Sequence, residues 1–182
     1  AVDRASEIVR AAGHEYGYLN LGGSSMSLLK FLPDENGNTA GKIGVINPRQ
    51  GKLYTGYDFM AVTAQDICLS SSGDYVQYYD LDGKRYSHII SPFTGYPVNA
   101  APQSEGGIVC ASVFGLTAAE GDATTTALMV MGREKAIEYI QSELSGAKVC
   151  FVYDNGDGTY TLYTNMQDGD YTVYAEMEIE KI

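Results

Sequence analysis

Apolar side chains recur at helical spacing over the first dozen residues of the chain. The positions that fall on one helix face are Val2, Ala5, Ile8, Val9 and Ala12. This spacing predicts a helix over Val2–Ala12. Gly13, which follows it, suits the left-handed conformation in which many helices end.

Short apolar runs separated by polar or glycine-rich turns dominate the rest of the chain, a pattern typical of strands. The runs predicted to be extended are Tyr16–Leu21, Met26–Phe31, Lys42–Ile46, Gly56–Thr63, Ile67–Leu69, Gly107–Phe114 and Tyr171–Ile179. A hairpin is predicted where Tyr75–Tyr79 and Lys84–Ile90 flank Asp82-Gly83, a dipeptide typical of two-residue turns. A second hairpin is predicted from Lys148–Tyr153 and Thr159–Thr164.

Two further helices are predicted in the second half of the chain. Asp122–Met131 has a helical pattern, with Asp122 at or near its N-terminus. Gly132 separates this run from a more polar helix over Glu134–Leu144, and the prolines of Ser91–Pro102 predict a loop. Hairpin strands with few helices indicate an α+β fold rather than a succession of βαβ units.

Composition and charge narrow the class of protein. The 182 residues suit one compact domain, and 45% hydrophobic residues are enough to bury a sizeable core. The formal net charge of −11 argues against nucleic acid or an anionic membrane as a partner, because neither attracts an acidic surface. Cys68, Cys110 and Cys150 lie in apolar runs, which predicts buried thiols, and no Cys-x-x-Cys motif supports a zinc site.

His88 is the first residue with candidate chemistry. It is predicted at the end of a hairpin strand, immediately before a Pro/Gly turn. Imidazole titrates near neutral pH, so a histidine held by a rigid turn suits general-base catalysis. The alternative is a histidine that makes only structural hydrogen bonds. His14, the other histidine, is predicted to be an exposed connector residue.

Asp122 and Thr126 are the second candidate. They are four residues apart, so a helix places both side chains on one face. A carboxylate and a hydroxyl are hard oxygen ligands of the kind that Mg²⁺ prefers. The alternative is that Asp122 is an ordinary N-cap, since aspartate is favoured there.

Two glycine-containing segments carry less information. Asn20–Ser25 matches neither the phosphate-loop nor the dinucleotide-binding pattern, and a plain turn explains it. Asp154–Gly158 resembles part of a calcium loop, but Gly156 and Asn165 stand where that loop needs oxygen ligands. We therefore expect Asp154–Gly158 to be a hairpin turn.

Five stretches, in order along the chain, have the character of motifs. They are Ala1–Arg4 (Ala-Val-Asp-Arg), Leu19–Gly23 (Leu-Asn-Leu-Gly-Gly), Ser71–Tyr75 (Ser-Ser-Gly-Asp-Tyr), Ser87–Pro97 (Ser-His-Ile-Ile-Ser-Pro-Phe-Thr-Gly-Tyr-Pro) and Asp122–Ala127 (Asp-Ala-Thr-Thr-Thr-Ala). Together they resemble the ApbE family of flavin transferases. The last two resemble the family patterns His-Ile-Ile-Asp-Pro-x-Thr-Gly-x-Pro and Asp-Ala-x-x-Thr-Ala, which are specific when found together.

The resemblance implies an enzyme that transfers FMN from FAD to a threonine or serine hydroxyl of a target protein, with Mg²⁺ as cofactor and release of AMP. The implied metal ligands are Asp122, Thr126 and the Thr125 carbonyl. The implied base is His88. The implied contacts with the flavin nucleotide are Ile90, Thr94 and Gly95. The implied fold is a T-fold-like pair of antiparallel sheets with packed helices.

The chain also departs from the family pattern. Ser91 replaces an aspartate and Ser24 an asparagine. The chain begins within a family motif, so we expect residues 1–182 to be the C-terminal portion of one ApbE-like domain that needs its N-terminal half. The rival functions are FAD binding without transfer, cleavage of FAD to FMN and AMP, and a structural domain with no ligand. The resemblance also implies an extracytoplasmic protein, either a membrane-anchored lipoprotein or a periplasmic one.

Overall fold

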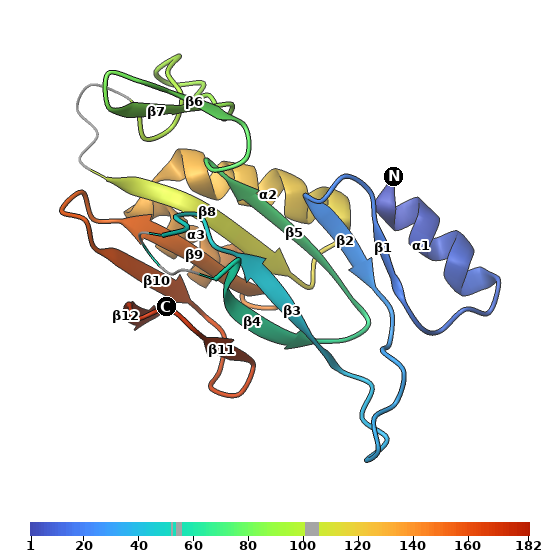
Figure 1. Ribbon diagram of the computed structural model, residues 1–182. Helices are drawn as coiled ribbons and strands as arrows, with labels where there is room; N and C mark the ends of the chain where they lie inside the picture. Colours follow the sequence, from blue (N-terminus) through green and yellow to red (C-terminus); the bar gives the residue numbers. More distant parts are fainter. Residues whose placement is uncertain (52, 54–55, 101–105) are drawn as a thin grey trace.

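The computed structural model describes residues 1–51, 53, 56–100 and 106–182. Within them, seven strands form a central sheet (Figure 1). In spatial order they are β1 (Tyr18–Asn20), β2 (Ser25–Leu28), β5 (Ile67–Gly73), β8 (Gly107–Phe114), β9 (Lys148–Asp154), β10 (Tyr160–Thr164) and β12 (Glu178–Lys181). Neighbouring strands are antiparallel except β10 and β12, which are parallel.

The two faces of this sheet are covered by different layers. Three helices lie on one face or beside its edge: α1 (Val2–Ala11), α2 (Ala118–Met131) and α3 (Arg133–Glu143). The other face packs against a small sheet of β11 (Tyr171–Val173), β4 (Asp58–Ala64) and β3 (Gly41–Ile46). The hairpin of β6 (Tyr78–Leu81) and β7 (Lys84–Ser87) stands at one end of the central sheet, as Figure 1 shows. The α+β prediction is confirmed.

Strand β9 shows why the central strands are apolar throughout. Val149 and Phe151 belong to the core on the helix side, whereas Cys150 and Val152 belong to the core on the side of the small sheet. Because alternate side chains of a strand point to opposite faces, a strand covered on both faces needs apolar residues at every position. The site described below therefore rests on a rigid double-sided core.

Helix α2 begins earlier than the sequence pattern predicts. Thr117 is its N-cap, and Thr117 and Glu120 form a reciprocal capping box. The carboxylate of Asp3 accepts the backbone N–H groups of Ala118 (2.6 Å) and Ala119 (3.0 Å). The prediction that Asp122 stands at or near the helix N-terminus is thus wrong, because the helix begins at Ala118 and its first N–H groups are already capped there.

Three other predictions are corrected or confirmed by the structure. Tyr171–Ile179 is not one strand: β11 pairs with β4 in the small sheet, and β12 pairs with β10 in the central sheet. The Asp82-Gly83 hairpin is confirmed, with φ of 52° and 76° at the two turn residues, as a turn with left-handed residues requires. The predicted loop Ser91–Pro102 is found as far as residue 100, and its positions 101–102 lie outside the described residues.

The predicted first helix is found, although Ile8 on its apolar face is 56% exposed. In the part of the chain that the structure describes, none of the helices has the length and apolar character needed to cross a bilayer.

Candidate functional site

A cluster of hydroxyl groups joins α2 to the end of β5. Asp122 and Thr126 lie on the exposed side of α2, one turn apart, and the Thr126 hydroxyl donates to the Asp122 carbonyl oxygen (3.0 Å). The hydroxyl oxygen of Ser72 lies 3.1 Å from that of Thr126 and 2.8 Å from that of the buried Thr125. The predicted metal residues are therefore brought together, with Ser72 as a further oxygen beside them.

The Asp122 carboxylate is approached by a second pair of serines. The Ser25 hydroxyl donates to Asp122 Oδ1 at 3.5 Å, and Ser70 Oγ lies 2.9 Å from Ser25 Oγ. Gly121 makes this close packing possible, because a Cβ at its position would lie 2.9 Å from Ser70 Oγ. The sequence predicted no role for Ser25, Ser70 or Ser72, although Ser72 lies in the Ser71–Tyr75 motif and alternates with Ser70 along one strand, a spacing that places both on the same face.

The residues of this cluster fit a hard cation. Every side chain of the cluster that could bind a metal does so through oxygen, the ligand atom that Mg²⁺ prefers. The described residues hold no group of three or more histidines, cysteines or acidic residues that would form a complete metal site. A cation beside Asp122 would therefore need hydroxyl, carbonyl, water or substrate oxygens to complete its shell. Ligation by the Thr125 carbonyl stays a prediction, since that residue lies within α2, where carbonyls accept helical N–H groups.

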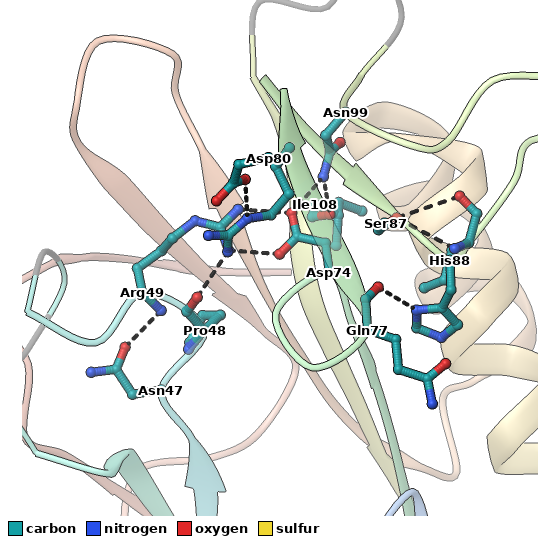
Figure 2. A network of polar contacts seen from close by, with 12 residues as sticks. Asn47, Pro48, Arg49, Asp74, Gln77, Asp80, Ser87, His88, Asn99 and Ile108 are labelled. Atoms are coloured by element: carbon teal, nitrogen blue, oxygen red, sulfur yellow. Dashed lines mark hydrogen bonds and ion pairs between the residues drawn. The ribbon is translucent and has the colours of Figure 1, made fainter. Parts of the chain in front are cut away.

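His88 directly follows β7 and is held by one backbone carbonyl. Its N–H donates to the Gln77 oxygen (3.0 Å), and its ring Nδ1 lies 3.1 Å from the same oxygen (Figure 2). A carbonyl oxygen only accepts, so this contact requires a proton on Nδ1. In the neutral ring, Nε2 is then the basic nitrogen. The exposed imidazole is thus oriented to accept a proton from a ligand.

The loop after His88 is anchored at Ile89 and exposed beyond it. Ile89 is buried in the helix-side core, and its carbonyl accepts the N–H of Val98 (2.9 Å). The next turn is closed by bonds from the Ser91 N–H to the Tyr96 carbonyl and from the Gly95 N–H to the Ser91 carbonyl, each 2.9 Å.

The residues predicted to contact flavin are Ile90, Thr94 and Gly95, and all three are exposed on this turn.

Among the described residues, no hydrogen bond joins His88 to the Asp122–Thr126 cluster. Both are nevertheless connected to the same part of the chain. Ser72, which contacts the threonines, lies five residues before Gln77, which holds His88. The end of β5 and the segment that follows it therefore link the two predicted halves of the site.

Two deeply buried charges lie elsewhere among the described residues; Asp74 belongs to the Ser71–Tyr75 motif, but the sequence predicted no ion pair for it. Arg49 and Asp74 form a two-pronged ion pair, Nη1–Oδ1 2.6 Å and Nη2–Oδ2 2.7 Å, and their side chains are only 12% and 2% exposed. Burial acts to lower the pKa of Arg49, but its hydrogen bonds to Asp74 and the charge of that carboxylate outweigh burial and raise it. Asn99 adds a longer contact to Asp74 Oδ2 (3.4 Å).

This ion pair lies at a cavity of about 1180 Å³. The cavity is lined by neither His88 nor any residue of the Asp122–Thr126 cluster. Figure 2 shows the strands of the central sheet between the Arg49–Asp74 pair and His88. The molecule thus presents two separate features, the exposed oxygen and imidazole groups on the helix side and a cavity on the other.

The comparisons with known proteins agree with the predicted family. The ApbE family profile matches residues 1–151. The FAD:protein FMN transferase of Escherichia coli K12 is 44% identical over 93 residues, which are 51% of this chain and 24% of that protein. That of Buchnera aphidicola subsp. Schizaphis graminum is 31% identical over 136 residues, covering 75% of this chain and 36% of that one.

A solved structure, the flavin transferase ApbE from Vibrio cholerae, has a TM-score of 0.68 and 26% sequence identity. The match covers 90% of this chain and 46% of that one. The matched residues thus span about a quarter of the length of the first relative and about half of the solved structure.

Proposed function

Because the chain belongs to the ApbE family, we propose that the protein carrying it transfers FMN from FAD to a threonine or serine hydroxyl of a target protein. One observation carries the proposal: an exposed histidine with a fixed tautomer and an oxygen-rich Asp/Thr pair occur at the positions of two family motifs. In the proposed reaction the acceptor oxygen attacks the phosphorus of the FMN half. The bond from that phosphorus to the bridging oxygen breaks, and AMP leaves with that oxygen.

The residues of the chain have separate roles in this proposal. His88 Nε2 takes the proton of the acceptor hydroxyl, while the Gln77 carbonyl holds the ring through Nδ1. Asp122 and Thr126 are the proposed side-chain ligands of Mg²⁺, with the Thr125 carbonyl as a third. When bound, Mg²⁺ neutralises charge on the pyrophosphate. Ile90, Thr94 and Gly95 are proposed to contact the flavin nucleotide.

The rival functions, FAD binding or FAD cleavage without transfer, rest on Ser91, which stands where the family pattern has an aspartate. In the structure the Ser91 hydroxyl accepts the N–H of Phe93 (3.3 Å), within its own turn. His88 is oriented by Gln77 instead. The orienting role that a carboxylate would have is therefore filled by a backbone group, which supports transfer.

The test uses the full-length protein with FAD, Mg²⁺ and a recombinant target domain with one acceptor threonine. We expect covalent flavin on the target, seen by in-gel fluorescence, and one AMP per label by chromatography. His88→Gln is expected to slow transfer by about 10²–10⁴-fold, the usual size of general-base catalysis. The matched control is His14→Gln, which removes the other histidine, an exposed one, and should leave the rate unchanged.

The alternatives give different products. FMN and AMP without a labelled target indicate a pyrophosphatase, and FAD binding without either product indicates a binding protein. Transfer that survives both Asp122→Ala and His88→Gln would show that the site is assigned wrongly.

We also propose an extracytoplasmic location for the protein. Fractionation of cells that produce the full-length protein tests this location.

A further inference from the structure

The cavity beside the hairpin is large and rich in tyrosine. Its volume of about 1180 Å³ exceeds the roughly 300–1,000 Å³ that small-molecule pockets occupy. Four tyrosines contribute to its wall: Tyr57, Tyr75, Tyr78 and Tyr160. Tyrosine supplies a large, rigid contact surface with a polar end, and it is enriched where proteins bind other proteins.

The floor of the cavity is preformed. Arg49 and Asp74 satisfy each other, and Asn99 Nδ2 donates to the Ile108 carbonyl (2.8 Å). Asn99 has a φ of 65° and packs against Gly107, where any Cβ would overlap its Oδ1. A partner that enters the cavity therefore meets groups that are already ordered and paired, which lowers the entropy cost of binding.

The rim of the cavity exposes apolar and aromatic groups. Val76 is 71% exposed, Tyr57 66% and Tyr78 44%. The Arg85 guanidinium lies 3.7 Å from the centre of the Tyr78 ring, and Lys84 makes no ion pair with any residue that the structure describes. Exposed aromatic rings beside arginine are the side chains that most often dominate protein–protein binding.

The rim is connected to His88 through one residue. Val76 and Tyr78 line the cavity, and Gln77 between them holds the imidazole by its carbonyl. His88 itself lies across the strands from the cavity floor (Figure 2). The rim residue Val76 adjoins Gln77, and an extended polypeptide advances about 3.3 Å per residue, so a segment that lies against the rim can continue past Gln77 to the imidazole.

We propose that this cavity binds an extended segment of the target protein that flanks the acceptor hydroxyl, while the hydroxyl itself reaches His88. The inference rests on the proposed function and adds to it a binding site for the protein substrate, separate from the proposed flavin and metal contacts. The exposed tyrosines and Val76 hold the segment, and the buried Arg49–Asp74 pair keeps the floor in place.

The test measures steady-state transfer by the full-length enzyme to the recombinant target domain. Val76→Asp and Tyr57→Ser are expected to raise the KM for the target domain by about tenfold or more, because each removes an exposed anchor. The dissociation constant for FAD, measured by fluorescence, stays within twofold. The matched control is Leu32→Asp, an apolar residue that is 77% exposed and does not line the cavity.

The outcomes separate the two proposals. If the unaltered enzyme does not label the target, the proposed function fails, and this inference with it. If it labels the target and both rim variants keep its KM within twofold, the cavity is not the binding site and the proposed function stands. A weaker FAD affinity in both variants would instead show that the cavity belongs to the flavin site, and would overturn the inference. Melting temperatures show that each variant is folded.

Discussion

The imidazole of His88 is oriented by a backbone carbonyl and not by a carboxylate. The Gln77 oxygen fixes the tautomer through its contact with Nδ1. The carboxylate of Asp122 also has a neutral partner, the Ser25 hydroxyl at 3.5 Å. Among the described residues, no lysine, arginine or histidine forms an ion pair with it. Both groups thus have neutral partners. The negative charge of Asp122 and the lone pair on His88 Nε2 are therefore available to a ligand.

The buried thiols of Cys110 and Cys150 and the phenol of Tyr75 should make the stability of the folded chain depend on pH in the alkaline range. Burial raises the pKa of Cys150 to about 12 and raises the pKa values of Cys110 and Tyr75 as well. A folded-state pKa above the unfolded value means that the folded chain resists deprotonation. The stability that this contributes is complete below the unfolded pKa, near 9 for cysteine and 10 for tyrosine, and is lost as the pH rises further.

We therefore expect the free energy of unfolding, measured in urea, to fall between about pH 8 and pH 10.5. Tyr75→Phe removes one of the groups concerned, so its stability should fall less steeply over the upper part of this range. Equal stability of the unaltered chain at both pH values would contradict the prediction.

At the scale of elements, the start of α2 is capped from two directions. Thr117 and Glu120 cap it locally, and Asp3 caps it from α1, 115 residues away. The Thr117 hydroxyl and N–H lower the pKa of Glu120, since they stabilise its charged form. This position sets the register of α2, and with it the face on which Asp122 and Thr126 lie.

Thr117→Ala is expected to lower the free energy of unfolding by about 1 kcal/mol, because it leaves one helix N–H unpaired. Thr124→Ala is the control within the same helix. Thr124 caps nothing, and alanine is the better helix former, so this variant should be no less stable than the unaltered chain. Urea unfolding followed by circular dichroism measures both. A loss of equal size in the two variants would show that the cap is not the cause.

At the scale of the whole molecule, Arg49 and Asp74 connect the small sheet to the central one. Arg49 follows β3, and Asp74 follows β5. Since both charges are almost fully buried, removing one leaves the other without compensation. We expect Asp74→Asn to cost about 3–5 kcal/mol, whereas replacing both residues by apolar ones costs far less.

Denaturant unfolding of Asp74→Asn and of the double variant Arg49→Met/Asp74→Leu tests this. The exposed pair Arg4–Glu7 provides the comparison, because its side chains are 75% and 65% exposed and Glu7→Gln should change stability by less than about 1 kcal/mol. If Asp74→Asn is no more costly than Glu7→Gln, the buried pair does not connect the two sheets energetically.

Local features were predictable because neighbouring residues decide them. Strand β8 was predicted with the bounds that the structure shows, Gly107–Phe114, since eight consecutive residues carry its apolar pattern. The turn at Asp82-Gly83 follows from two residues that tolerate positive φ. The pairing of Asp122 with Thr126 follows from helical spacing alone, and the family motifs follow from residue identity.

The sequence by itself determined the α+β class, the hairpins, the family and the residues worth testing. Only the tertiary structure decided that Asp3 caps α2, that Tyr171–Ile179 divides between two sheets, and that Arg49 meets Asp74 beside a cavity. The physical reason is the range of the interactions. Spacing and propensity act over a few residues, whereas these contacts join residues between 17 and 115 positions apart, for which no local pattern exists.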